Sequence, residues 1–195
     1  MNVKDMLRQA SDAAKQLITL SDQTIIGILK ETAQVLRTHT EEVLAANRQD
    51  LERMDPANPK YDRLKLTEER LQGIAADMEN VSTLPSPLNK VLSETTRPNG
   101  MVIRKVTVPF GVIGVIYEAR PNVTFDVFSL CFRSGNVCVL KGGSDADFSN
   151  RALVHIIHSV LERQGINPAV CTLLPPDREA TAELLGAAGL VDLII

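Results

Sequence analysis

The sequence reads GVIGVIY at 111–117, VCVLK at 137–141, AVCTLL at 169–174 and LVDLII at 190–195. Short, nearly continuous apolar runs of this kind are typical of strands that are buried on both faces of a parallel sheet. Three segments of helical length separate them, at 123–133, 146–164 and 177–188. The order β-α-β-α-β-α-β predicts an α/β fold with a doubly wound parallel sheet and right-handed crossovers.

The region before this sheet divides into helices and a hairpin. In residues 1–89, apolar side chains recur at helical spacing, and Ser21 and Thr67 are suitable N-caps for two of the helices. Residues 90–109 read as two strands joined at Pro98-Asn99-Gly100, because Asn-Gly readily adopts the backbone of a hairpin turn. We therefore expect one domain over 1–195, made of a helical segment (1–89), a hairpin arm (90–109) and βα units (110–195).

Composition and charge exclude several classes of function. The net charge of −3 argues against a nucleic-acid-binding surface, which needs clustered Lys and Arg. No apolar run approaches the roughly 18–20 residues that span a bilayer, and MNVKDMLRQA at the start lacks the apolar core of a signal peptide. We expect no membrane partner and a cytoplasmic location. The cysteines are expected to be reduced and buried; they are Cys131, Cys138 and Cys171.

Ligands of open parallel sheets bind beyond the carboxyl ends of the strands. Lys141 ends one predicted strand, and Gly142 and Gly143 could let a ligand approach the backbone. Ser144 and Asp145 could cap the next helix. These residues suit a nucleotide, but an ordinary turn with a solvated lysine explains them equally well. Neither G-x-G-x-x-G nor a P-loop is present, and the glycines of GVIG (111–114) suit close packing inside a strand.

The stretch VPFGVIGVIYEARPNVTFDVFSLCFRSGNVCVLKGGSDA (108–146) resembles the signature segment of γ-glutamyl phosphate reductases, also called glutamate-5-semialdehyde dehydrogenases, which are relatives of the aldehyde dehydrogenases. The similarity continues through 149–166 to the last residue, and the N-terminal helices fit more loosely. The resemblance implies an incomplete aldehyde dehydrogenase-like Rossmann-type domain that binds NADP(H). It also implies NADPH-dependent reduction of L-glutamyl 5-phosphate to L-glutamate 5-semialdehyde, the second step of proline biosynthesis, by an enzyme that is a homo-oligomer when full length.

The same resemblance assigns cofactor residues. Lys141, with Gly142 and Gly143, takes the place of a lysine that contacts the adenosine ribose or its phosphate. Ser144 stands where NAD-preferring relatives often carry a glutamate. A small neutral residue leaves room for the 2′-phosphate and removes a like charge, which favours NADP. A purely structural role of Ser144 as a helix cap is compatible with this assignment.

For the groups at the reacting carbon, the resemblance allows more than one assignment. Asn122 is the nearest candidate for the oxyanion donor of the superfamily, although a gapless match would put Arg120 there. Arg120 could instead bind the acyl phosphate through its planar fork of donors, and a plain structural role stays open for both residues. The nucleophilic cysteine belongs to a catalytic domain that is absent from this chain, so the isolated chain is expected to be inactive.

Two further readings remain. A non-catalytic module for nucleotide binding or subunit interaction is the alternative function. His155 and His158 can share a helix face, but no third ligand is evident, and we expect no metal site.

Overall fold

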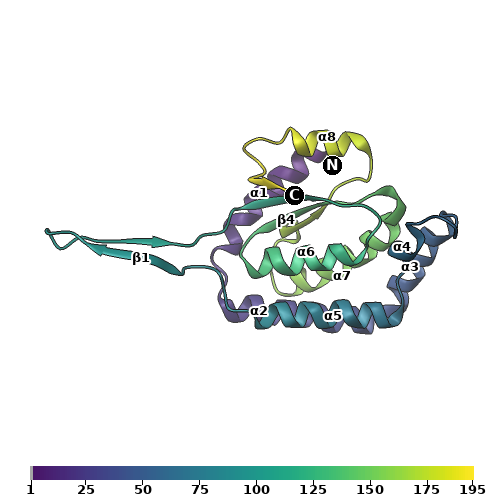
Figure 1. Cartoon of the computed structure of the whole chain (residues 1–195), viewed down its shortest axis with the longest axis horizontal. Coiled ribbons are helices and arrows are strands. Elements are labelled where there is room, and N and C mark those ends of the chain that lie inside the picture. Colours follow the sequence, from purple (N-terminus) through teal and green to yellow (C-terminus); the bar gives the residue numbers. More distant parts are fainter. Residues whose placement is uncertain (1) are drawn as a thin grey trace.

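A computed structural model describes residues 2–195 of the chain. Its centre is a four-stranded sheet in which every neighbouring pair is parallel, in the order β5-β4-β3-β6 (Figure 1). All four apolar runs therefore supply strands, which confirms the predicted parallel sheet. The strand β4 spans its whole run, whereas β3, β5 and β6 are shorter than theirs; ahead of β5, Pro168–Val170 forms a turn of 3-10 helix (η2). Their bounds are β3 Val112–Ile116, β4 Val137–Lys141, β5 Cys171–Leu173 and β6 Leu193–Ile194.

Helices cover both faces of the sheet. On one face α1 packs against β4 and β5 and contacts α8; on the other, α6 and α7 lie between the sheet and an outer pair formed by α2 and α5 (Figure 1). A one-turn helix, α4, was not predicted. The bounds are α1 Val3–Leu17, α2 Asp22–Thr38, α3 Thr40–Glu52, α4 Tyr61–Leu64, α5 Glu68–Thr83, α6 Asn122–Arg133, α7 Asp147–Arg163 and α8 Arg178–Leu185.

Local sequence signals explain where two of the outer helices begin. The Ser21 hydroxyl accepts a hydrogen bond from the Thr24 amide at 3.1 Å, and the Thr67 hydroxyl accepts one from the Arg70 amide at 3.2 Å. Both caps satisfy amides that have no partner inside the helix. The N-caps predicted from the sequence are confirmed.

The hairpin arm is formed by β1 (Val91–Thr96) and β2 (Val102–Val106), which pair antiparallel and project from the body (Figure 1). Gly100 adopts a φ of +82°, and the Arg97 amide donates to the Met101 carbonyl across the turn. The predicted turn at Pro98-Asn99-Gly100 is confirmed. Every residue of both strands is exposed, including Val91, Leu92, Val102, Ile103 and Val106.

The side chain of Asp192, which directly precedes β6, forms a hydrogen bond with the start of β3. Asp192 Oδ2 accepts a hydrogen bond from the Val112 amide at 2.8 Å, and the Asp192 amide donates to the Val112 carbonyl at 2.9 Å. Gly111, with φ +120°, precedes this contact, and a Cβ there would lie 2.2 Å from Asp192 Oδ2. At Gly114 a Cβ would lie 3.1 Å from Leu184 Cδ1. The GVIG glycines therefore serve close packing, as expected.

None of the helices in residues 2–195 is both long and apolar enough to cross a membrane.

Candidate functional site

The turns after β3 and β4 lie side by side at the carboxyl edge of the sheet. The amide of Tyr117, which follows β3, donates to the carbonyl of Lys141, the last residue of β4, at 3.1 Å. From β3 the chain crosses first to β4 and β5 on one side and finally to β6 on the other. Ligands of such sheets bind where the strand order reverses. The two sequence segments that we singled out thus meet at the expected edge.

Lys141 is almost fully enclosed, with 5% of its surface exposed. Its Nζ donates to the Gly142 carbonyl at 3.0 Å and to the Pro176 carbonyl at 3.2 Å. Burial lowers the pKa of the ammonium, and the charge of Asp177 opposes that shift. The alternative of a solvated lysine is therefore wrong. An ammonium has three donors, so one N–H of Lys141 remains for a ligand oxygen.

The two glycines after Lys141 differ in their surroundings. A Cβ on Gly142 would lie 2.3 Å from Asn150 Nδ2, so this glycine makes room for a side chain of α7 rather than for a ligand. A Cβ on Gly143 would meet only the Glu118 backbone, at 3.8 Å. Close approach of a ligand to the backbone is thus available at Gly143.

Asn150 belongs to a buried polar network that the sequence analysis did not identify. Its Oδ1 accepts a hydrogen bond from the Thr124 hydroxyl at 3.0 Å, and that hydroxyl lies 2.8 Å from the Tyr117 hydroxyl. Burial raises the pKa of Tyr117, so its hydroxyl keeps its proton at neutral pH. The network joins the end of β3 to α6 and α7.

Ser144 begins a short 3-10 helix, η1 (Ser144–Ala146), and its side chain caps neither this turn nor α7. The first amides of α7 bind Asp50 of α3 instead: the Phe148 amide donates to Oδ1 at 3.2 Å and the Ser149 amide to Oδ2 at 2.8 Å. The predicted capping by Ser144 and Asp145 is therefore wrong. Ser144 is exposed, and its hydroxyl has no hydrogen bond within the part of the chain that the structure describes.

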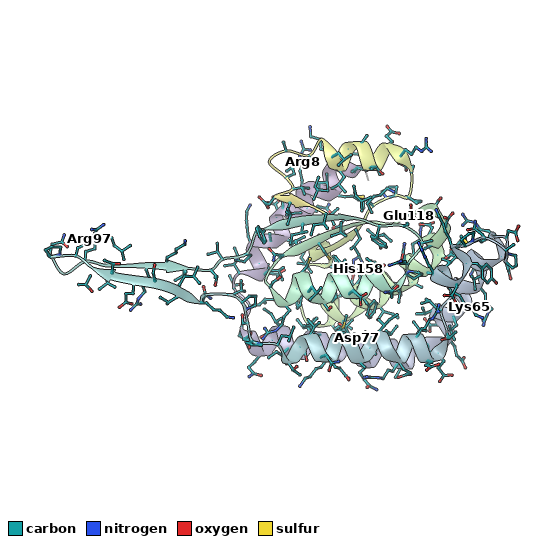
Figure 2. All side chains as sticks on the ribbon, viewed as in Figure 1. Arg8, Lys65, Asp77, Arg97, Glu118 and His158 are labelled. Carbon is teal, nitrogen blue, oxygen red and sulfur yellow. The ribbon has the colours of Figure 1, made fainter. Side chains whose placement is uncertain are left out.

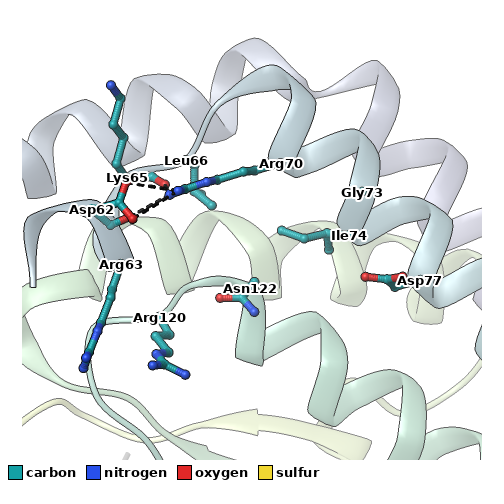
Figure 3. Close-up of a pocket in the computed structure, with 10 residues that line it drawn as sticks. All are labelled: Asp62, Arg63, Lys65, Leu66, Arg70, Gly73, Ile74, Asp77, Arg120 and Asn122. Carbon is teal, nitrogen blue, oxygen red and sulfur yellow. Dashed lines mark hydrogen bonds and ion pairs between the residues drawn. The ribbon is translucent and has the colours of Figure 1, made fainter.

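Arg120 and Asn122 line a cavity of about 350 Å³ that lies between α5 and the start of α6 (Figure 3). Asn122 is the first residue of α6, and its Nδ2 donates one hydrogen bond, to Asp126 Oδ2 at 3.1 Å. The second N–H of this amide remains available. The side chain of Arg120 is exposed and extends beside that of Arg63, which comes from α4 (Figure 3).

The other polar side chains of this cavity differ in whether they are paired. Arg70 binds Asp62 at 3.1 Å and the carbonyls of Asp62 and Lys65. Neither Arg63, Arg120 nor Asp77 forms an ion pair among residues 2–195. The sequence analysis did not identify Arg63 or Asp77 as site residues, because the cavity forms only when the α4–α5 region packs against the turn after β3.

The segment before α4 also reaches the edge of the sheet. Lys60 Nζ lies 3.6 Å from Glu118 Oε2 and 3.9 Å from Asp145 Oδ2, so it contacts both strand-end turns. Glu118 lies at the end of the body opposite to the arm, whose tip carries Arg97 (Figure 2). The arm is therefore far from the candidate site.

The cysteines lie inside the protein, and all three are free and buried. Burial raises the pKa of Cys131, and contact with the Cys171 thiol together with burial raises the pKa of Cys138. A nucleophilic cysteine needs an accessible thiolate. These surroundings disfavour that role for the three cysteines of this chain.

The two histidines differ in their surroundings, since His155 is exposed and His158 is half-buried. A ring nitrogen of His158, Nε2, lies 2.7 Å from the Cys171 carbonyl. Across residues 2–195, no three His, Cys, Asp or Glu side chains gather in a way that could hold a metal ion.

Comparison with known proteins finds relatives of the kind that the sequence resembles. No model of a protein family matches the chain. The chain is 98% identical over 195 residues to a γ-glutamyl phosphate reductase from Parabacteroides distasonis, and it covers 47% of that protein. The chain thus spans about half the length of the curated relatives it matches. The resemblance noted in the sequence is confirmed.

Solved structures show the same fold. A γ-glutamyl phosphate reductase from Thermotoga maritima superposes with a TM-score of 0.95 at 30% identity, over 100% of this chain and 48% of that one. A glyceraldehyde-3-phosphate dehydrogenase from Methanocaldococcus jannaschii, solved in complex with NADP, gives a TM-score of 0.74 at 18% identity, over 98% of this chain and 40% of that one. The predicted fold class is confirmed: an aldehyde dehydrogenase-like α/β fold that corresponds to part of a longer protein.

Proposed function

We propose, on the premise that the chain shares the sequence and fold of γ-glutamyl phosphate reductases along its whole length, that it supplies the N-terminal NADP-binding domain of such an enzyme. The reaction is NADPH-dependent reduction of L-glutamyl 5-phosphate to L-glutamate 5-semialdehyde with release of phosphate, in proline biosynthesis from glutamate, in the cytoplasm. The nucleophilic cysteine comes from a catalytic domain outside these residues. The observation that carries the proposal is the meeting of Lys141 and the Arg120–Asn122 turn at one edge of the sheet.

The residues at this edge fit a dinucleotide phosphate. Lys141 has one N–H to donate to the ribose or its phosphate, the backbone of Gly143 is open to close approach, and the Ser144 hydroxyl is exposed beside it. Gly142 serves this arrangement indirectly, by admitting Asn150 beneath the turn. When bound, NADPH supplies the hydride. The part of this chain in that step is to bind and orient the cofactor.

The turn after β3 acts on the substrate. Asn122 donates its second N–H to the oxygen that becomes negative when the thiol adds to the acyl carbon. Arg120 binds the phosphate group that leaves, because a guanidinium offers several donors in one plane to phosphate oxygens. Both side chains line the same cavity.

A hybrid enzyme tests this function. It is the Parabacteroides distasonis relative with its matched 195 residues replaced by this chain. We expect the hybrid to reduce NADP⁺ with L-glutamate 5-semialdehyde and phosphate, the reverse of the proposed reaction. The 195-residue chain alone should show no activity, because its thiols are buried. The absorbance of NADPH measures both. Activity of the chain alone, or a folded but inactive hybrid, would contradict the proposal.

Cofactor choice is tested at Ser144. In the hybrid, Ser144→Glu places a carboxylate beside the proposed 2′-phosphate, and we expect the preference for NADP⁺ over NAD⁺ in kcat/KM to fall about 10- to 100-fold, as for one lost charged contact. Ser144→Gln is the matched control, since it has similar size without the charge. An equal fall in both variants would indicate a steric effect, and no change in either would place the 2′-phosphate elsewhere.

A second candidate role, association with another subunit, is favoured by the hairpin arm. A two-stranded ribbon is marginally stable by itself, and this one exposes apolar side chains on β1 and β2. Covering the arm with a neighbouring subunit would remove those side chains from water. Sedimentation of the hybrid enzyme measures whether it forms the homo-oligomer that this role requires.

A further inference from the structure

The cavity beside Asn122 separates positive from negative charge. Arg63 and Arg120 extend together at one end, Asp77 of α5 lies at the other end, and Asn122 is between them (Figure 3). The volume of about 350 Å³ is in the range of small-molecule sites. A ligand that matches this cavity carries an anionic group and a cationic group on the same small molecule.

A second carboxylate, Asp126 of α6, lies next to the negative end, in contact with the cavity residue Asn122 and close enough to Asp77 for the two charges to interact. Its pKa is raised by burial and further by the charge of Asp77, while the hydrogen bond from Asn122 acts in the opposite direction. Within the described residues, neither carboxylate has a Lys, Arg or His partner. Two neighbouring carboxylates without a cation repel each other, and a cationic ligand group would relieve that repulsion.

The spacing along α6 suits the proposed substrate. Asn122 and Asp126 are one helical turn apart, and their side chains are in contact, with Asn122 Nδ2 3.1 Å from Asp126 Oδ2. In L-glutamyl 5-phosphate, four bonds of about 1.5 Å each separate the acyl carbon from the α-nitrogen. An acyl oxygen at Asn122 therefore leaves the α-ammonium group within reach of Asp126 and Asp77, while the phosphate can extend toward Arg120.

We propose that Asp77 and Asp126 bind the α-ammonium group of the substrate, so that the enzyme selects an α-amino acid derivative over the analogue without the amino group. This inference rests on the proposed function and names the part of the substrate that this end of the cavity recognises. Asp77 makes the accessible contact, because it is exposed to the cavity. Asp126, half-buried at the base of α6, adds negative charge and holds Asn122.

The test compares two aldehydes in the hybrid enzyme, L-glutamate 5-semialdehyde and 5-oxopentanoate, which lacks the amino group. Each reacts with phosphate and NADP⁺ to give the acyl phosphate, NADPH and a proton. We expect the hybrid to prefer the amino substrate in kcat/KM, and Asp77→Asn to lower that preference about 10-fold or more, as for the loss of one charged hydrogen bond. Asp77→Glu keeps the charge and should restore most of the preference.

Glu68→Gln is the matched control, because Glu68 lies in the first turn of the same helix, is exposed and is outside the cavity. It should leave the preference unchanged. Asp126→Asn provides a second variant and should also lower the preference. An active hybrid that shows no preference for the amino substrate, or whose preference is unchanged by both Asp77→Asn and Asp126→Asn, overturns this inference and leaves the proposed function standing. A folded hybrid with no activity on L-glutamate 5-semialdehyde overturns both.

Discussion

Replacing Asn122 with alanine in the hybrid enzyme is expected to lower kcat about 10²- to 10³-fold, the usual cost of removing one oxyanion donor. The effect should fall on kcat because the donor acts on charge that develops only in the transition state. The side chain has the required free N–H and lines the cavity. Initial rates at saturating L-glutamate 5-semialdehyde, phosphate and NADP⁺ measure the change.

Two further variants serve as controls for the Asn122→Ala result. Val123→Ala removes a neighbouring side chain of α6 without removing a polar group, and it should change kcat by less than about 3-fold, the scale of a minor packing effect. Arg120→Ala should mainly raise the KM for phosphate in this direction, because it removes a binding group. If Arg120→Ala lowers kcat strongly and Asn122→Ala does not, Arg120 is the oxyanion donor.

Gly111→Ala is expected to destabilise the fold by about 2–6 kcal/mol, through backbone strain of about 1–3 kcal/mol and a lost or distorted hydrogen bond of about 1–3 kcal/mol. Gly111 has a φ of +120°, where a side chain is strained, and a Cβ would displace the carboxylate that accepts from the Val112 amide. The contact joins β3 to β6, so its loss should weaken the pairing of these two strands, which backbone hydrogen bonds also join. Thermal unfolding of the hybrid enzyme measures the change.

Gly165→Ala is the control for this substitution. Gly165 also has a positive φ, +68°, but a Cβ there would meet nothing within 4 Å. It therefore reports backbone strain alone, and its effect should be smaller than that of Gly111→Ala. Equal shifts in the unfolding temperature would show that displacement of Asp192 contributes nothing.

The sequence predicted those parts of the fold that depend on local signals. Continuous apolar runs predicted the four parallel strands, Asn99-Gly100 predicted the hairpin turn, and Ser21 and Thr67 predicted two helix starts. Each signal acts over a few residues, because strand burial, turn geometry and capping are set by near neighbours.

The features that the sequence did not predict depend on partners far along the chain. The first amides of α7 bind Asp50, which is 98 and 99 positions away in the sequence. No motif near Ser144 could therefore predict this cap. In the sequence, Gly142 resembles a glycine that contacts a ligand, but in the structure the side chain of Asn150 packs against it. The charged cavity likewise combines α4, α5 and the turn before α6. Residue type suggested Arg120 and Asn122, whereas Asp77 needed the packing of α5.

The hydrogen-bonded series Tyr117–Thr124–Asn150 connects the two strand-end loops through α6 and α7, and the proposed function gives these loops different roles. Thr124 lies in the first turn of the helix that begins with Asn122, and Asn150 supports the backbone at Gly142. A disturbance of the turn after β4 would therefore shift Asn122, the proposed oxyanion donor. Effects of substitutions in the two loops should not add independently, and the proposed function therefore predicts that the free energies of cofactor binding and of catalysis are coupled.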